Sequence, residues 1–305
     1  MRRGRKNKRN IKIFIGLTIC LLLIMTVGYA AFRTNINITA KGNIIDKSRV
    51  IQSWENISNE DFHTDYYKEN IVTATFLDTN EIASNATESW DVSEAKDKGV
   101  MAWVVPTTED STKYDLYIGA NKGVIANEDS GFLFYNFTGL KYVHFGNNFD
   151  TENVRIMYFM FSGCNNLNQL DLSSFVTNNV VDMHCMFQYC NNLVELDLSN
   201  FNTESVTRMD YMFFRDFNLS SLDISNFNTS NVTNMEGMFS ECTNLLELNL
   251  CSFDTNKVTS MRWMFNQSWN ITNIFVGDNW TTANTDITAM FDGSAISSVT
   301  TGQCS

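Results

Sequence analysis

The second half of the chain repeats every 26 residues, and this periodicity restricts the fold more than any other feature of the sequence. Within each unit, a threonine follows the first phenylalanine by two residues, a valine by five, a methionine by eight and a Met-Phe pair by eleven. The first phenylalanines are Phe149, Phe175, Phe201, Phe227 and Phe253. A unit this short cannot bury its own apolar side, so neighbouring units must stack. The repeat predicts a solenoid over residues 131–300.

Each unit is expected to contain two elements. Val206, Met209, Met212 and Phe213 are spaced like one face of an α-helix, and Thr203 stands where it could cap the first turn. The second element reads Leu-x-x-Leu-Asp-Leu, whose last two apolar positions alternate as in a strand with one buried face. The expected fold class is therefore α/β: a leucine-rich-repeat solenoid with parallel strands on the concave side and short helices on the convex side.

An asparagine precedes the strand element in every unit. Such side chains can bond backbone groups of the neighbouring unit and so fix the turn. The asparagines are Asn166, Asn192, Asn218, Asn244 and Asn270.

Residues 193–213, LVELDLSNFNTESVTRMDYMF, resemble the BspA-type leucine-rich repeat of bacterial surface proteins. The similarity extends over residues 130–300, and residues 89–93, 100–103 and 114–118 resemble the segment that leads into such arrays. The resemblance implies display at the cell surface and adhesion or protein binding. It implies no catalysis.

The N-terminal segment, residues 1–31, is typical of a targeting sequence. Residues 2–12 are basic, and residues 13–31 are apolar and uncharged. The basic side should stay in the cytoplasm, which places the rest of the chain outside. Two interpretations remain open: a signal peptide cleaved after Ala30, or an uncleaved helix that anchors the chain through residues 13–31.

Residues 32–130 lack the repeat and are expected to form a β-rich region that caps the solenoid. Strands are predicted over residues 71–77, 100–105 and 114–118, with a further short strand within residues 36–45. Residues 47–68 are expected to be partly helical. A separate binding role for this region is an alternative.

The charge of the chain disfavours nucleic acid as a partner. The net charge is −12, although the first 31 residues contain seven bases and no acid, so the remainder is strongly acidic. Such a body repels nucleic acid and anionic membrane surfaces. No phosphate-binding loop, nucleophile motif or Cys-x-x-Cys pair is present. We therefore expect no cofactor, no metal and no enzymatic activity. His184 and Cys185 are adjacent, and neighbours on a helix do not face each other.

The sulfur-containing side chains are expected to lie in the core. Most methionines follow the repeat, where thioethers fill gaps. Cys164, Cys190 and Cys242 share one repeat position, and free buried thiols are favoured over a Cys164–Cys190 disulfide. Cys251 and Cys304 have no clear partner, so the disulfide state of Cys304 stays open.

One row of polar side chains is a candidate binding strip on the concave face. Asp171, Asp197, Asp223 and Asn249 stand between the buried strand positions of successive units. Like charges on adjacent strands repel, so a cation or a basic partner could offset them. The alternative is local hydrogen bonding to the turns.

These features predict a non-catalytic binding protein, either secreted or anchored at the cell surface by its N-terminal helix. Its partner would be a protein or glycan. A structural component of the envelope that associates with itself or with other surface proteins is the alternative. A hydrolase acting through residues 32–130 is a third class without a supporting motif.

Overall fold

The computed structural model describes residues 36–38, 44–54 and 60–304. The chain divides into two compact units, residues 1–48 and residues 49–305. In the first, strand β1 (Ile36–Ile38) pairs antiparallel with β2 (Ile44–Asp46), and a 3-10 turn (Lys47–Arg49) follows. The predicted signal or anchor helix over residues 13–31 lies outside the described residues. Within the described ranges, no helix is both long enough and apolar enough to cross a bilayer.

The second unit begins with a sheet in which three strands lie where the sequence predicts them. They are β3 (Ile71–Leu77), β5 (Val100–Pro106) and β6 (Tyr114–Ala120), whereas β4 (Glu88–Asp91) was not predicted. Strands β4, β5 and β6 pair antiparallel, and β6 pairs parallel with β3. The short helix α2 (Asp65–Asn70) precedes β3, and the Thr64 hydroxyl accepts a hydrogen bond from its Tyr67 N–H.

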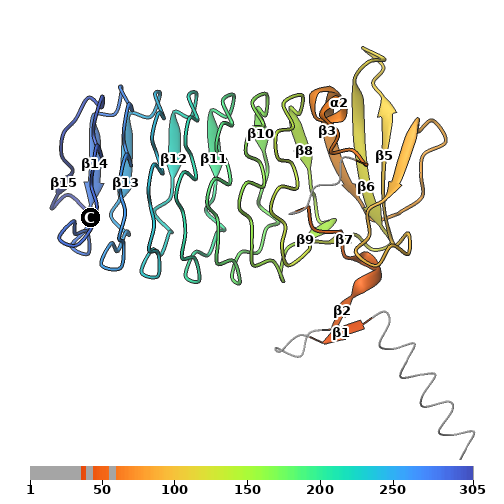
Figure 1. Ribbon diagram of the computed structural model, residues 1–305, viewed down its shortest axis with the longest axis horizontal. Coiled ribbons are helices and arrows are strands. Elements are labelled where there is room, and N and C mark those ends of the chain that lie inside the picture. The colour runs from red at the N-terminus through yellow and green to blue at the C-terminus, as the bar shows by residue number, and fades with distance from the viewer. Residues whose placement is uncertain (1–35, 39–43, 55–59, 305) are drawn as a thin grey trace, which may run out of the picture. The chain divides into compact units, whose positions relative to one another are not determined.

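The N-terminal sheet continues directly into the strands of the repeats. Strand β8 (Tyr142–His144) pairs parallel both with β3 and with β10 (Gln169–Leu170), so the N-terminal strands cover the first apolar edge of the array. Among the later repeats, β11 (Glu195–Asp197) pairs parallel with β12 (Ser221–Asp223) (Figure 1). Strand β14 (Asn273–Val276) pairs parallel with both β13 (Glu247–Leu250) and β15 (Thr300–Thr301). Two further strands, β7 (Val124–Ile125) and β9 (Phe149–Asp150), pair parallel with each other.

Stacked phenylalanine rings run through the centre of the array. Each repeat forms one coil, and the phenylalanine of its Met-Phe pair lies against the equivalent ring of the next coil, with centroids 5.5–5.9 Å apart and planes within 19°. Offset stacking adds to the burial of these large apolar side chains. The rings are Phe161, Phe187, Phe213, Phe239, Phe265 and Phe291, together with Phe134, which follows a leucine in the first coil.

The predicted short helices are wrong, because residues 131–300 contain turns and a second parallel ladder instead. The N–H groups of Met157, Phe159 and Phe161 donate to carbonyl groups of the next coil, so they are not available for a helix. Single β-bridges connect the same position of each coil to the next. We call this row the bridge ladder, and it consists of Asp129, Ile156, Asp182, Arg208, Asn234, Ser260 and Asp286.

A helix and this turn segment share the same apolar spacing. Within the coil, the N–H groups of Val154, Met160 and Cys164 donate to carbonyls three residues earlier. A three-residue period points every third side chain inward, as one face of a helix does. Left-handed residues interrupt the segment in each coil, among them Phe159 with a φ of 54° and Tyr211 with 56°. A helix does not tolerate that conformation in its interior.

The repeat threonines connect coils and cap no helix. The Thr177 hydroxyl donates to the carbonyl of Asn202 at 3.0 Å and accepts from the N–H of the same residue at 2.8 Å. Thr203 makes the same pair of bonds to Asn228. Each hydroxyl therefore takes the place of a backbone contact between neighbouring coils.

The asparagines that precede the strands also bond the neighbouring coil, as predicted, but in two ways. Asn166, Asn218 and Asn270 donate to backbone carbonyls. Asn192 and Asn244 donate to the side chain of the preceding asparagine instead. The row of asparagines therefore connects the coils partly through backbone carbonyls and partly through hydrogen bonds between side-chain amides.

Candidate functional site

The repeats present two long surfaces, one on each side of the shared core. We call the first the strand face, formed by the exposed residues of β8 and β10–β14 and the residues beside them. Along each strand the buried leucine or isoleucine alternates with exposed neighbours, as in Glu195-Leu196-Asp197. The alternation of side chains along each strand therefore places one row in the core and the flanking rows in solvent.

The predicted aspartate strip lies on the strand face. Asp197 is opposite Asp223 in the register of β11 and β12. The negative charge of Asp197 also acts on Asp171, where it disfavours ionisation. Each side chain accepts a hydrogen bond from the backbone N–H two residues later, at 2.9 Å for Asp171 and Asp197, 3.0 Å for Asp223 and 3.1 Å for Asn249. The local hydrogen bonds are thus present, and they use one oxygen of each side chain.

These local bonds keep the aspartates ionised. The pKa of Asp197 and of Asp223 is lowered by the backbone N–H of the following serine and, second, by its hydroxyl. For Asp171 the Ser173 hydroxyl is the larger cause and the N–H the second. A carboxyl with a lowered pKa stays charged at neutral pH. The strip therefore presents a row of fixed negative charges.

Two further carboxylates and two apolar side chains belong to the same face, and the sequence interpretation missed them. Glu195 and Glu247 are exposed, and beside them Val194 is 52% exposed and Leu246 is 55% exposed. Among the described residues, the aspartates and glutamates of this face take part in no ion pair. The signal was available in the alternating pattern, because each residue beside an inward leucine must face solvent.

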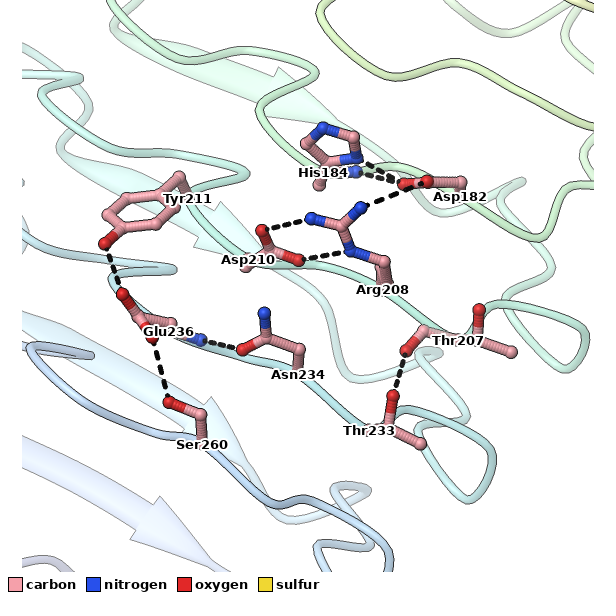
Figure 2. A network of polar contacts seen from close by, with 10 residues as sticks. All are labelled: Asp182, His184, Thr207, Arg208, Asp210, Tyr211, Thr233, Asn234, Glu236 and Ser260. Atoms are coloured by element: carbon pink, nitrogen blue, oxygen red, sulfur yellow. Dashed lines mark hydrogen bonds and ion pairs between the residues drawn. The ribbon is translucent and has the colours of Figure 1, made fainter. Parts of the chain in front are cut away.

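The second surface, which we call the bridge face, is formed by the bridge ladder and the residues two and three positions after it. Arg208 holds Asp210 through two contacts, Nε–Oδ1 at 3.0 Å and Nη2–Oδ2 at 2.8 Å, and its Nη1 lies 3.8 Å from Asp182 (Figure 2). Asp182 also contacts His184 Nδ1 at 2.6 Å. Charges on the bridge face therefore pair with one another.

A second part of the same network surrounds Glu236. The Tyr211 hydroxyl donates to one carboxylate oxygen at 2.7 Å, and the Ser260 hydroxyl donates to the other at 3.0 Å (Figure 2). Gly237, with a φ of 59°, makes room for the tyrosine, because a Cβ there would lie 2.3 Å from the Tyr211 ring. Polar side chains from three successive coils are fixed in this way.

His184 and Cys185 form no activated pair in this geometry. The His184 ring stacks on Tyr158 at 5.1 Å and its Nδ1 is engaged by Asp182. Burial raises the pKa of the Cys185 thiol to about 12, and the charge of Asp210 adds to the shift. A thiol with so high a pKa is a poor nucleophile at neutral pH.

The three cysteines at the shared repeat position are free and buried, as predicted. The thiols of Cys164, Cys190 and Cys242 donate to phenylalanine carbonyls of the preceding coil at 3.1, 3.2 and 2.9 Å. Asp216 occupies this position in one coil, where one oxygen accepts from the N–H of Cys190 at 2.8 Å. Burial raises the pKa of Asp216 well above its ordinary value.

Cys251 and Cys304 form a disulfide that the sequence interpretation did not assign. Their Cα atoms are 5.6 Å apart, and the bond ties the segment after β15 to the turn after β13. Both cysteines lie outside the repeated cysteine position, but so does the free Cys185, so the sequence does not single out this pair.

A family model described as "Mycoplasma protein of unknown function, DUF285" matches residues 132–214 and again residues 191–301. Among solved structures, the chain is similar to a leucine-rich repeat protein from Bacteroides ovatus, with 14% identity and a TM-score of 0.37, over 86% of this chain and 55% of that one. The chain thus spans about half the length of that protein. No curated protein matches the chain. The two family matches overlap and together cover more than half of the sequence. The chain therefore belongs to the family described as Mycoplasma protein of unknown function, DUF285.

Proposed function

We propose that this chain is a non-catalytic binding protein that presents its strand face to a protein or glycan outside the cell. The observation that carries the proposal is a contrast between buried and exposed positions of the same strands. The inward residue hardly changes from coil to coil: Val143, Leu170, Leu196, Leu222, Leu248 and Ile274. The outward residue just before it changes each time: Tyr142, Gln169, Glu195, Ser221, Glu247 and Asn273.

A constant scaffold with a variable exposed row is suited to recognition, because repeat arrays separate stability from surface chemistry. The unpaired carboxylates of Asp171, Asp197 and Asp223 favour a partner with basic groups, since such a partner relieves their mutual repulsion. Val194 and Leu246 add exposed apolar surface beside them.

Display outside the cell is supported by three features of different kinds. The Cys251–Cys304 disulfide is the type of bond that persists in oxidising compartments. The N-terminal segment has the basic and apolar pattern of an export signal or anchor. The resemblance to BspA-type surface proteins points to the same location.

Protease treatment of intact cells, followed by mass spectrometry of the mature N-terminus, tests the location. Release of peptides from residues 131–300, with residues 13–31 left in the cells, identifies an anchored surface protein. Repeats that appear in the medium with a chain beginning at Ala31 identify a secreted one. Repeats that are neither released nor secreted contradict the proposal.

Binding is tested with cells that carry the full chain, applied to printed arrays of proteins and glycans. The test variant changes Asp171, Asp197 and Asp223 to Asn, which keeps the shape of each side chain and removes its charge. The control variant changes Thr207 and Thr233 of the bridge ladder region to Ala. We expect the test variant to lose array binding at equal surface display and the control to retain it. Equal binding by both variants would show that the strand face is not the recognition surface.

A structural role in the envelope is the second candidate, favoured by exposed Val194 and Leu246. In that case the full chain in solution would associate with itself, and the same aspartate variant would change the association state.

A further inference from the structure

The N-terminal sheet carries a cluster of aromatic side chains at its edge, away from the repeats. We call it the aromatic corner: Tyr66 and Tyr67 of α2, Glu88 and Trp90 of the edge strand β4, and Tyr114 at the start of β6. In register, Glu88 lies beside Val104 and Trp90 beside Ala102, both buried. Trp90 contacts Tyr67 of α2, and Glu88 lies two residues before it along β4, so both side chains project from the side of the sheet on which α2 packs.

The rings meet edge to face around Tyr67. Its centroid is 5.3 Å from Tyr66, 5.5 Å from Tyr114 and 5.2 Å from Trp90, with interplanar angles of 72°, 72° and 80°. Tyr66 and Tyr114 are 6.1 Å apart at 65°. Tyr67 is buried, whereas Tyr66 is 54% exposed. Tyr67 thus forms the buried base of the cluster, and Tyr66 lies at its solvent-exposed side.

The polar groups of the corner are already engaged with one another. The hydroxyls of Tyr66 and Tyr114 share a hydrogen bond of 3.0 Å. The Tyr67 hydroxyl lies near the Glu88 carboxylate, and burial, followed by the interaction with Glu88, raises the pKa of Tyr67 far above the usual value. The Tyr67 phenol therefore stays neutral beside Glu88. Glu88 itself is exposed, and it belongs to no ion pair among the described residues.

Electron-rich ring faces beside a single carboxylate attract a cation. The corner offers only one carboxylate, whereas a hard metal ion needs several oxygen ligands. A sugar needs several free donors and acceptors, and most of the hydroxyls here are already paired. A soft, weakly hydrated organic cation matches the available groups best, because it can lie against rings while its charge faces Glu88.

We propose that the aromatic corner binds an organic cation of the quaternary-ammonium class, with Tyr66 and Tyr114 as ring contacts and Glu88 as the counter-charge. This site is separate from the strand face, so it does not depend on the proposed recognition surface. Its failure would leave that proposal unaffected.

The test compares choline with its uncharged carbon analogue 3,3-dimethylbutan-1-ol. Each is titrated into the purified full chain, in a detergent without a choline head group, and binding is followed by saturation-transfer NMR of the ligand methyl protons. We expect choline to bind and the neutral analogue to bind about tenfold or more weakly, because the neutral analogue makes no cation–π contact and has no charge to pair with Glu88.

Variants separate the ring from its hydroxyl and from the charge. Tyr66→Leu and Glu88→Gln should each weaken choline binding about fivefold to thirtyfold, and Tyr66→Phe should retain most of it. Tyr142→Leu is the matched control, since Tyr142 is an exposed tyrosine on the strand face and 37% exposed. Unfolding temperatures of all variants establish that the sheet remains folded.

Several outcomes would overturn the proposal. Choline and the neutral analogue binding alike would remove the role of charge. Equal losses in Tyr66→Leu and Tyr142→Leu would place binding elsewhere. Methyl β-glucoside binding in preference to choline would make the corner a sugar site. Absence of choline binding at about 50 mM, far above the ~1 mM dissociation constant that corresponds to about −4 kcal/mol, would show that no cation site exists.

Discussion

The repeat position of Cys164, Cys190 and Cys242 shows what a single buried residue must do in this array. Each thiol donates to a phenylalanine carbonyl of the preceding coil, and Ser268 does the same at 2.8 Å. A small donor is required there. Free buried thiols could be predicted from the repeat alone, because parallel side chains in equivalent positions do not point at each other. The donor role could not be predicted, since it depends on the path of the neighbouring backbone.

Asp216 is a carboxyl group in this donor position, and we expect it to limit stability at high pH. Burial raises its folded pKa well above the unfolded value of about 3.9. Stability is therefore fully present below about pH 4 and is lost as the pH rises through the folded pKa. Asp216→Ser should raise the free energy of unfolding by about 1–3 kcal/mol at pH 9, and by less at pH 5.

Denaturant titrations of both proteins at pH 5 and pH 9 measure this difference. Cys242→Ser is the matched control, because that position holds an uncharged donor in the next coil and its effect should not vary with pH. A gain from Asp216→Ser that is equal at both pH values would rule out a buried titrating carboxyl.

Gly237 leaves room for the Tyr211 ring to reach Glu236 in the neighbouring coil. Gly237→Ala should lower the free energy of unfolding mainly because the added Cβ displaces this ring. The equivalent residues Phe159, Cys185, Trp263 and Ala289 carry side chains at similar positive φ angles, so the backbone conformation alone is tolerated. We expect a loss of about 1–3 kcal/mol from displacement of Tyr211 and its bond to Glu236. In a double-mutant cycle, Gly237→Ala should cost clearly less in a Tyr211→Ala background. Additive losses would locate the cost in the backbone.

At the scale of the element, the segment between the repeat threonine and the Met-Phe pair is where sequence interpretation failed. Its apolar side chains are inward in both a helix and a row of three-residue turns, so the pattern alone could not distinguish them. The left-handed residues differ in type, as Phe159, Cys185 and Tyr211 show. Because most of them are not glycine, the sequence did not mark the positions of positive φ. The strand element, by contrast, was predictable because alternation has a single structural explanation.

The threonine contacts between coils should contribute strongly to the stability of this element. Thr203 is buried and both donates to and accepts from the backbone of Asn228. Thr203→Val keeps the shape but removes the partner of the Asn228 N–H and carbonyl in a partly buried contact, so we expect a loss of about 1–3 kcal/mol in chemical denaturation. Thr207→Val, at an exposed hydroxyl that bonds Val181, should change stability by only about 0.5 kcal/mol. Equal effects would show that water replaces both bonds.

At the scale of the whole second unit, the coils of the array were predictable, but the way the first coil joins the N-terminal sheet was not. The 26-residue spacing defined the coils, and the need to cover the first apolar edge led to the expected β-rich cap. The continuous pairing of β10, β8 and β3 could not be read from the sequence, because strand neighbours depend on the path between them. The same holds for the candidate site: the aspartate row followed from alternation, whereas the bridge face depends on contacts between coils.

The Cys251–Cys304 disulfide should stabilise the last coils locally. Because each coil contacts only its neighbours, loss of the bond is expected to loosen β14 and β15 and leave the N-terminal sheet unchanged. Cys304→Ser should lower the local opening free energy there by about 2–4 kcal/mol. Amide hydrogen exchange followed by mass spectrometry measures both regions at once. Faster exchange in β3 and β6 as well would mean that the unit unfolds as a whole.

In the central coils, equivalent residues 26 positions apart pair in the same parallel register, and this has a consequence for inheritance. A gene that gains or loses one whole repeat by recombination still encodes a chain whose hydrogen-bond ladders match from coil to coil. The length of the array can therefore vary among descendants without a new fold. Each duplication also begins with a copy of an existing exposed row, which mutation is then free to diversify.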